Sequence, residues 1–428
     1  MHRSCNRPPG AYFPGWRTPR PGSARPRWPA ALAGTGLLAV LLLLSACSTA
    51  SSAMALTLTP NPVLTQTFAE ALRLAARALD TPTPTQTPVP PTATPTPSPT
   101  ATPIRTPPAL PETFTSKLLP SGVAPQAYVQ NTCEYLKNRW DPNNSAPGTV
   151  VMTIMYHSVT EDYKPLLPDG SQVHDIDLVR AFEHAHEVGF QTITTTQLAD
   201  FLDHNAKIPP RSLLIIVDDR KRKQYYEDHF FPFLEKYGWT ITNAWISAAD
   251  TPDYLYQENE AVVATGLVDP QAHGVVHNVP VNDYSHDDFI LNELEGSIEA
   301  IQQHFGKRPI AYIWPGGGFS KRAVELAKEV GYRIGFTTNP RGPVMYNWIP
   351  QAAKLDPAHT LWLPEIPAGD PLMTLPRYWS SDAAYRIDDV INIGKQAAAK
   401  ATQDKATELE YYDIVCKART GPIPTLAP

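Results

Sequence analysis

The sequence predicts an α/β protein whose parallel βα units are arranged as a barrel. Between residues 149 and 338, short apolar runs alternate with longer amphipathic stretches that mostly end at glycine. This alternation is typical of parallel sheets, in which a helix connects each strand to the next. No glycine-rich dinucleotide motif follows any of the apolar runs, which disfavours a Rossmann-type sheet. The number of predicted strands favours a barrel-like arrangement over a short open sheet.

Each expected element has its own signal. Apolar runs predict strands at 149–156, 191–196, 212–217, 240–246, 310–314 and 333–338, with a short strand or strand end at 272–276. Amphipathic periodicity predicts helices at 177–188, 197–204, 221–237, 286–305 and 320–330. Asp177 is the expected cap of the first helix, and the expected helix stops are Gly189, Gly238, Gly306 and Gly331.

Residues 1–47 have the composition of an export signal. The first 30 residues contain six Arg and no Lys, Asp or Glu, and an apolar run follows at 31–44. This run is shorter than the roughly 20 apolar residues that a spanning helix needs, and small residues follow it, as at a signal cleavage site. The ending Leu-Ser-Ala-Cys resembles a bacterial lipobox, in which Cys47 would be lipidated. The alternative is an ordinary signal peptide that is cut after a small residue.

Residues 48–112 are expected to be a disordered linker. An amphipathic stretch at 68–79 is compatible with a transient helix, and 81–112 contain twelve Pro among Thr, Ala and Ser. That composition is typical of an extended polyproline-type stalk, which at about 3.1 Å per residue would reach on the order of 100 Å. We therefore expect an exported protein anchored by lipid to the outer face of a bacterial membrane. Its domain would face the cell wall or the extracellular space.

The charge of the chain restricts the class of partner. The sequence has 36 Lys and Arg against 42 Asp and Glu, and six of the Arg lie in the expected signal. The mature chain would therefore carry 30 basic residues and a formal charge of −12. This excess of acid disfavours nucleic acid or another polyanion as the substrate, because little would neutralise its charge. A neutral glycan remains compatible, and no protein partner is evident.

The four cysteines have separate expected positions. Cys5 lies in the signal, and Cys47 is the lipidation candidate. Cys133 and Cys416 bracket the part expected to fold, and an exported protein can keep a disulfide between such residues. Two unrelated thiols are the alternative.

Two adjacent carboxylates, Asp218 and Asp219, follow the apolar run at 213–217, and His273 and His277 lie downstream at i, i+4 spacing. Neighbouring like charges destabilise each other unless a positive group separates their roles. A divalent metal held by Asp219 and the two histidines would do so, and would leave Asp218 free as a base. The alternative is an acidic turn after a core strand, with two unrelated histidines.

Two further segments end at the same predicted rim. His157 follows a predicted strand and is a candidate proton donor for a leaving group, while Trp314-Pro315-Gly316-Gly-Gly follows another. In βα barrels the reacting groups gather at the carboxyl ends of the strands. Each segment has a structural alternative, because His157 is also compatible with a hydrogen-bonded core histidine and the glycine-rich run with a tight bend.

These motifs resemble those of the polysaccharide deacetylases, the family with the NodB-homology domain. Ile-Val-Asp-Asp-Arg at 216–220 resembles the family's Thr-Phe-Asp-Asp-Gly motif, and His-Gly-Val-Val-His at 273–277 resembles His-(Ser/Thr)-x-x-His. Tyr-Ile-Trp-Pro-Gly-Gly at 312–317 is similar to the proline-containing loop that lines the groove. The resemblance covers roughly 149–345.

The resemblance implies a distorted (β/α)7 barrel that removes acetyl groups from N-acetylated glycans with a divalent metal, usually zinc. It implies Asp218 as the base, with Asp219, His273 and His277 as metal ligands. Met-Tyr-His at 155–157 resembles the permuted exopolysaccharide deacetylase branch, in which the acid histidine comes from the first strand. On this basis 113–148 would be a pre-domain segment and 346–428 a C-terminal extension.

The chain departs from the family pattern at four positions. Arg220 replaces a Gly, Gly274 a Ser or Thr, Ile313 an Arg and Gly316 an aromatic residue. Arg377 is a candidate substitute for the missing arginine, and the backbone N–H of Gly316 could still serve an oxyanion. Trp314, Pro315, Gly316, Arg220 and Arg377 are therefore the expected groove and oxyanion residues.

The departures leave two further functions open. A catalytically decayed glycan-binding module on the same fold is the main alternative. An amidase for a small non-sugar substrate is a third possibility, in which residues 248–268 would wall off the site.

Overall fold

Seven parallel strands form the centre of the structure. The computed structural model describes residues 105–425, so Cys47, the export signal and most of the linker predicted from the sequence lie outside the described residues. Neighbouring strands follow the order β10-β9-β8-β7-β6-β2-β12, and every pair on this path is parallel. Their bounds are β2 Val150–Tyr156, β6 Arg211–Asp218, β7 Ile241–Trp245, β8 Val268–Ala272, β9 Ala311–Ile313, β10 Ile334–Phe336 and β12 Tyr378–Trp379. The predicted α/β class with parallel strands is confirmed.

The segment 375–379 closes the sheet into a barrel. Leu375 bridges Phe336 of β10 in parallel, and its backbone N–H donates to the carbonyl of Gly335 at 2.8 Å. A few residues later, β12 pairs with Ile154 and Met155 of β2. One short segment therefore joins both ends of the strand order, which gives the seven-stranded barrel that the family resemblance implied.

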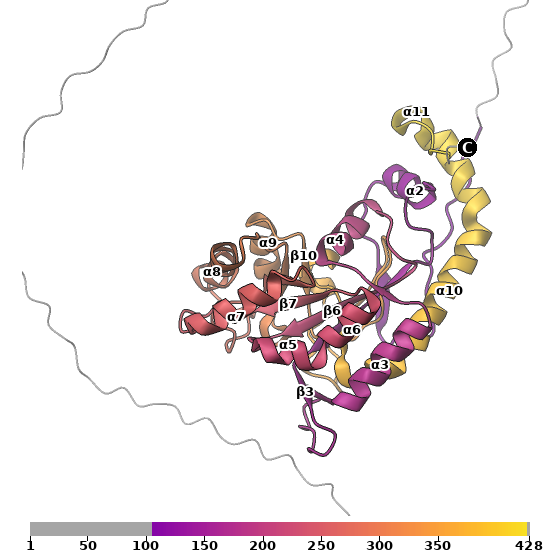
Figure 1. Cartoon of the computed structure of the whole chain (residues 1–428). Helices are drawn as coiled ribbons and strands as arrows, with labels where there is room; N and C mark the ends of the chain where they lie inside the picture. The colour runs from indigo at the N-terminus through magenta and orange to yellow at the C-terminus, as the bar shows by residue number, and fades with distance from the viewer. Residues whose placement is uncertain (1–104, 426–428) are drawn as a thin grey trace, which may run out of the picture. The chain divides into compact units, whose positions relative to one another are not determined.

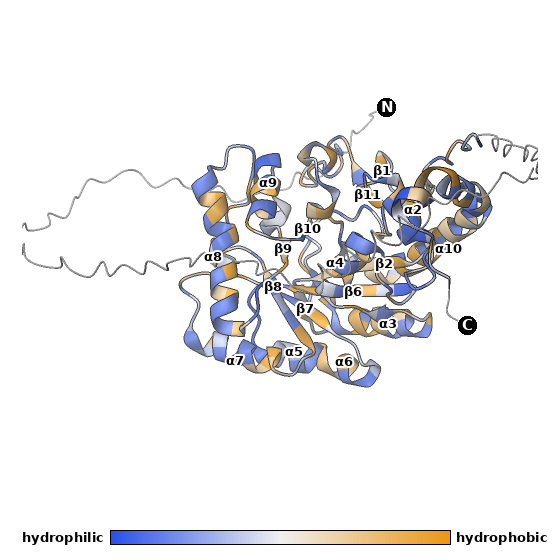
Figure 2. Cartoon of the chain, turned by 90° about the horizontal axis from the view of Figure 1, so that it is seen from above, coloured by the Kyte–Doolittle hydropathy of each residue, from blue (hydrophilic) through white to orange (hydrophobic). Residues whose placement is uncertain are grey.

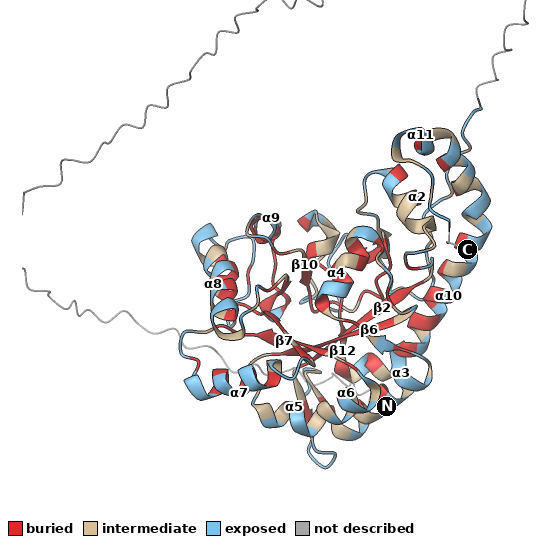
Figure 3. Cartoon of the chain, turned by 45° about the horizontal axis from the view of Figure 1, so that its top comes forward, coloured by how far each residue is buried: buried red, intermediate tan, exposed pale blue. Residues whose placement is uncertain are grey.

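The strands are apolar because both of their faces are buried. All seven residues of β2 are buried, as are Ser212–Asp218 of β6. Such continuous apolar runs are typical of parallel strands that are covered on both sides. Figure 3 shows the buried residues concentrated on the central strands and the exposed residues on the outer faces of the helices.

Helices surround the barrel and carry their hydrophilic residues outward (Figures 1 and 2). Their bounds are α2 Thr132–Trp140, α3 Asp175–Glu187, α4 Thr195–His204, α5 Lys223–His229, α6 Phe231–Tyr237, α7 Asp253–Val263, α8 Asp287–Phe305, α9 Lys321–Glu329, α10 Ser380–Tyr411 and α11 Lys417–Thr420. Short strands lie outside the barrel path, namely β1 Val123–Gln126, β3 Ser158–Thr160, β4 Gln172–His174, β5 Gln191–Thr192 and β11 Ile349–Ala352. No described helix combines the length and apolarity that crossing a bilayer requires.

Two predicted helices differ from those in the structure. The helix expected at 221–237 is divided into α5 and α6 at Phe230, because Pro232 lacks an N–H and is accommodated only in the first turn of a new helix. The helix expected from 177 begins earlier, at Asp175, and its cap position is His174. Asp177 is therefore a first-turn acid and not the cap that the sequence predicted.

Two strand boundaries also differ, and one helix was not predicted. The strand expected at 191–196 ends at Thr192, because Thr194 caps α4 through a reciprocal capping box with Gln197. The strand expected at 272–276 lies earlier, as β8, where Pro270 interrupts the usual strand pattern. Residues 248–268 contain helix α7, which the sequence analysis had missed.

Residues beyond 345, which the sequence led us to expect as a C-terminal extension, contribute to the barrel. Residues after 345 contribute β12, and α10 packs along β2 and α3. The pre-domain segment joins this part through β1, which pairs antiparallel with β11. Backbone pairing between distant segments sets this boundary, and local composition does not reveal it.

A disulfide joins Cys133 of α2 to Cys416, beyond the end of α10, which is the first of the two alternatives for these cysteines. Both residues are buried in a small apolar cluster with Leu136 and Tyr412. Nearby, Arg105 pairs with Glu410 of α10 and with Asp413, which lies just beyond that helix. The N-terminal end of the described chain is thus fixed to the C-terminal end of α10, which is the end distant from β12.

Candidate active site

Polar side chains from separate strands meet at the carboxyl rim of the barrel. Asp218 is the last residue of β6, His157 directly follows β2, and His273 directly follows β8. Arg377 directly precedes β12. Because parallel strands end at the same rim, residues that are far apart in sequence come into contact there.

Asp219, His273 and His277 form a compact cluster of candidate metal ligands. One ligand atom from each lies within 4.8 Å of the others. The two His Nε2 atoms are 3.2 Å apart, and His277 Nε2 is 3.3 Å from Asp219 Oδ1. Ligands about 2.0–2.2 Å from one tetrahedral ion are separated by roughly this distance. The donor set therefore fits a divalent cation such as zinc.

The backbone and the barrel fix these ligands in place. His273 is 2% exposed, and its Nδ1 lies 2.8 Å from the carbonyl oxygen of Ile313, to which it can donate. That hydrogen bond leaves Nε2 free as a ligand. Asp219 and His277 have left-handed backbones, with φ of 73° and 55°. Strain of this kind in non-glycine residues occurs often at functional sites, where surrounding contacts hold it.

Burial also affects the protonation of His273. Because burial disfavours the charged imidazolium, it lowers the pKa of His273, and the nearby carboxylates only partly oppose this effect. The neutral imidazole is the form that ligates a metal.

Arg377, just before the last barrel strand, stabilises the ionised form of Asp218. Both side chains are fully buried, and Arg377 Nη1 donates to Asp218 Oδ1 at 2.7 Å and to Oδ2 at 2.9 Å. Burial alone would raise the pKa of Asp218, but the Arg377 guanidinium, with smaller contributions from the neighbouring His157 and His273, outweighs it and holds that pKa below its ordinary value. Asp218 is therefore a carboxylate at neutral pH.

His157 lies beside this carboxylate. Its Nε2 is 3.4 Å from Asp218 Oδ2, and its ring stacks on Trp379 at 5.7 Å between centroids, with 15° between the planes. His157 is partly exposed, so it is not the fully enclosed core histidine that the sequence left open. Trp379 was not foreseen, because nothing in its local sequence relates it to a residue more than 200 positions away.

The expected groove residues have different environments. Trp314 is fully buried and donates from Nε1 to the carbonyl of Met373, so its side chain cannot line a groove as predicted. Pro315 is buried as well, whereas Gly316 is exposed, with φ of 57°. The indole packs inward because it fills the space between β9 and the segment before β12.

Arg220 lies next to the metal cluster but does not contact Asp218. Its Nη1 donates to Thr251 Oγ1 at 2.8 Å and to Asp250 Oδ1 at 3.3 Å. With Asp219 and His277 it lines a surface groove of about 390 Å³. A second cation that the sequence did not reveal is Lys221, whose Nζ is 3.5 Å from Asp219 Oδ2.

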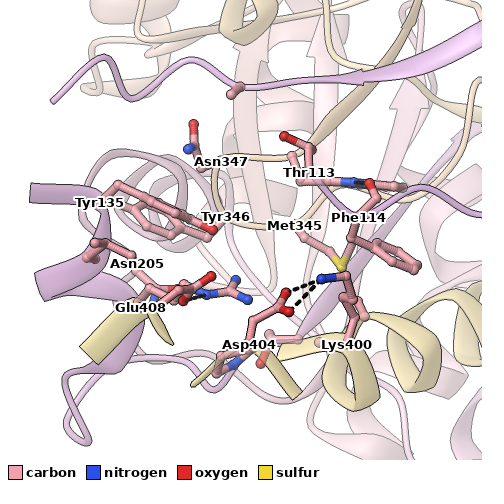
Figure 4. Close-up of a pocket in the computed structure, with 18 of the residues that line it drawn as sticks. Thr113, Phe114, Tyr135, Asn205, Met345, Tyr346, Asn347, Lys400, Asp404 and Glu408 are labelled. Atoms are coloured by element: carbon pink, nitrogen blue, oxygen red, sulfur yellow. Dashed lines mark hydrogen bonds and ion pairs between the residues drawn. The ribbon is translucent and has the colours of Figure 1, made fainter. Parts of the chain in front are cut away.

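The cavity drawn in Figure 4 is separate from this site. It has a volume of about 150 Å³ and is lined by α2, α10 and residues near the start of β2, and no candidate site residue lines it. Four of its charged groups pair within the wall, Lys400 with Asp404 and Arg139 with Glu408. We therefore assign the chemistry to the rim and not to this cavity.

The protein is therefore a parallel βα barrel with one candidate metal centre at its rim, formed by an Asp-His-His cluster beside an arginine-bound carboxylate. Residues 205–335 match the family described as polysaccharide deacetylase. Asp218, Asp219, His273 and His277 all lie within the match, whereas His157 and Arg377 lie outside it.

The chain is similar to a curated protein and to several solved structures. YxkH of Bacillus subtilis (strain 168), whose name places it among polysaccharide deacetylases, is 23% identical over 189 residues, which are 44% of this chain and 64% of YxkH. The deacetylase PplD of Streptococcus pyogenes, solved with acetate, is 16% identical with a TM-score of 0.42, over 56% of this chain and 98% of PplD. IcaB of Ammonifex degensii is 15% identical with a TM-score of 0.42, over 57% of this chain and 97% of IcaB.

Proposed function

We propose that this protein removes acetyl groups from an N-acetylated cell-surface or extracellular polysaccharide in a metal-dependent hydrolysis. The observation that carries the proposal is the position of Asp218. Its Oδ2 lies 3.4 Å from His157 Nε2 and 4.0 Å from His273 Nε2. A candidate base thus lies between a candidate acid and a candidate metal centre.

The residues would divide the work of hydrolysis. Asp219, His273 and His277 would hold a divalent cation, with zinc expected. When bound, such a cation supplies Lewis acidity to a water molecule and to the acetyl carbonyl. Asp218, kept ionised by Arg377, takes the proton of the attacking water. His157 donates a proton to the departing amine, so that the amide C–N bond breaks and acetate and a free amine result.

The position of the candidate acid His157 in the chain supports placing this protein in the permuted exopolysaccharide deacetylase branch. His157 directly follows the first barrel strand, and Arg377 precedes the last one. Both contact Asp218, so the chain has an arginine beside the candidate base even though Ile313 replaces the family's usual one. The expected export and lipidation at Cys47 would place this activity on the outer face of a membrane.

The decisive experiment measures metal content and acetate release separately. The zinc-loaded full chain should bind about one divalent ion per molecule and release acetate from chito-oligomers. Asp218→Asn should keep the ion and lose acetate release, whereas Asp388→Asn, an exposed change on α10, should keep both. Full activity in Asp218→Asn would disprove the assignment of the base.

A decayed glycan-binding module is the second candidate, and Arg220 favours it. Arg220 stands where the family has Gly and lines the groove beside Asp219 and His277. This alternative predicts metal binding and measurable affinity for chito-oligomers without acetate release from a broad panel of acetylated glycans. Acetate release from any of these glycans would exclude it.

A further inference from the structure

We propose that Glu293 is a positioning residue that holds the 273–277 loop in its metal-binding conformation. It would replace the Ser or Thr hydroxyl that the family resemblance leads one to expect at Gly274. The inference rests on the proposed metal centre, and it assigns a function to a buried acid on α8 that the reaction itself does not use.

The carboxylate of Glu293 accepts hydrogen bonds from two consecutive N–H groups of the loop. Oε2 accepts from Val275 N at 2.9 Å, and Oε1 accepts from Val276 N at 2.7 Å. These two residues lie between the candidate ligands His273 and His277. Because each oxygen receives one N–H, the carboxylate fixes both the position and the orientation of the loop.

Two glycines make room for this contact. A Cβ at Gly274 would lie 2.5 Å from Glu293 Oε2 and 2.9 Å from Pro315 Cγ, and the backbone there has φ of 77°. A Cβ at Gly296, one helical turn after Glu293, would lie 3.0 Å from Val275 Cγ2. The glycine at 274 therefore does more than omit the expected Ser or Thr hydroxyl. It vacates the space that the Glu293 carboxylate enters.

Stability alone does not explain a carboxylate at this position. Glu293 is 1% exposed, and within residues 105–425 it forms no ion pair with Lys, Arg or His. A buried charge with only hydrogen-bond partners is costly, and an apolar side chain of similar size is often as stable or more so. Its two hydrogen bonds to the loop that carries two candidate metal ligands instead indicate a role in holding that loop.

The test compares Glu293→Gln with Glu295→Gln, an exposed change on the same helix. Glutamine keeps the shape and one acceptor oxygen but turns its NH2 group toward the second loop N–H. In the full chain, chelator competition with Zn²⁺ should show about 10- to 100-fold weaker binding for Glu293→Gln. Glu295→Gln should bind zinc as the unmodified chain does. Equal zinc affinity in all three proteins would overturn the proposal.

A second measurement does not depend on the metal. Hydrogen exchange of the metal-free protein should show faster exchange at the Val275 and Val276 amides in Glu293→Gln, and no change in Glu295→Gln. Glu293→Asp, which is too short to reach both amides, should behave in the same way if the Gln variant folds poorly. Unchanged exchange in both variants would disprove the positioning role.

The two measurements separate this inference from the proposed function. If the unmodified chain binds no Zn²⁺, the proposed metal centre fails, while the amide exchange still reports whether Glu293 holds the loop. If the amides exchange faster but zinc affinity does not change, Glu293 has only a structural role and the inference fails alone.

Discussion

Arg377 Nη1 donates hydrogen bonds to both carboxylate oxygens of Asp218, at 2.7 and 2.9 Å, although 159 positions separate the two residues. Arg377 also donates from Nε to the carbonyl of Thr337 at 2.8 Å, which anchors it to the segment after β10. The pair therefore joins three strands of the rim. It holds the carboxylate ionised and limits its rotation.

Removing the arginine should destabilise the fold strongly. Arg377→Met leaves the buried carboxylate of Asp218 without its main partner, and breaking a buried pair in this way costs about 3–5 kcal/mol. Urea unfolding at pH 7 should show this loss. The control is Arg180→Met on exposed α3, which should change the free energy of unfolding by less than about 0.5 kcal/mol. Equal stability of both variants would show that the pair is dispensable.

The same pair predicts an acid-dependent loss of stability. The folded-state pKa of Asp218 is lowered, so its stabilisation is complete above the unfolded pKa of about 3.9 and declines as pH falls toward the folded value. The difference in unfolding free energy between the unmodified chain and Asp218→Asn should be constant above about pH 5. Below about pH 4 it should shrink. A difference that grows on acidification would contradict the lowered pKa.

Truncating a candidate ligand should reduce metal affinity without unfolding the barrel. His277→Ala removes one of three ligands from a partly exposed loop, so the core stays intact. We expect the loss of Zn²⁺ affinity to exceed the roughly 10- to 100-fold loss typical of residues that only support a ligand. Chelator competition gives the affinity, and circular dichroism confirms the fold. His204→Ala on α4 is the matched control and should bind zinc normally.

Arg220 should influence turnover more than metal binding. Its guanidinium contacts Thr251 and Asp250, so Arg220→Gly, which restores the family residue, removes no contact to Asp218. We expect Zn²⁺ affinity to change less than about 3-fold, well below the 10-fold that about 1.4 kcal/mol would give. Any change should appear in KM or kcat for acetate release. A large loss of zinc affinity would instead make Arg220 a support of the metal centre.

The disulfide should contribute measurably to stability. It connects α2 to the chain beyond α10, and removing a native disulfide typically costs about 2–5 kcal/mol. Replacing both Cys133 and Cys416 with serine should lower the urea midpoint, and reductant should lower the midpoint of the unmodified chain in the same way. Insensitivity of the unmodified chain to reductant would argue against the bond in solution.

Local sequence was informative wherever one segment carried its own signal. The apolar runs identified the strands β2, β6, β7, β9 and β10, because burial on both faces requires continuous apolar side chains. The adjacent pair Asp218-Asp219 and the i, i+4 histidines identified the candidate metal cluster, since these residues share short segments. The family resemblance then supplied their expected roles.

Contacts between distant segments could not be derived in this way. Trp314 was expected at a groove, but its indole is buried against Met373. Helix α7 was not predicted. The start of β8 was missed because Pro270 and the neighbouring polar residues hide the strand pattern. The stacking of His157 on Trp379 depends on β12 pairing with β2, a pairing that no local pattern encodes.

The sequence alone therefore determined the parallel βα class and the Asp-Asp and His-x-x-x-His motifs, because hydrophobic periodicity and ligand spacing are local properties. The tertiary structure decided that residues 375–379 close the barrel, that Arg377 binds Asp218 and that Glu293 supports the loop behind Gly274. Barrel closure brings together side chains from opposite ends of the chain. Their contacts depend on strand register and burial, and only the folded arrangement fixes these.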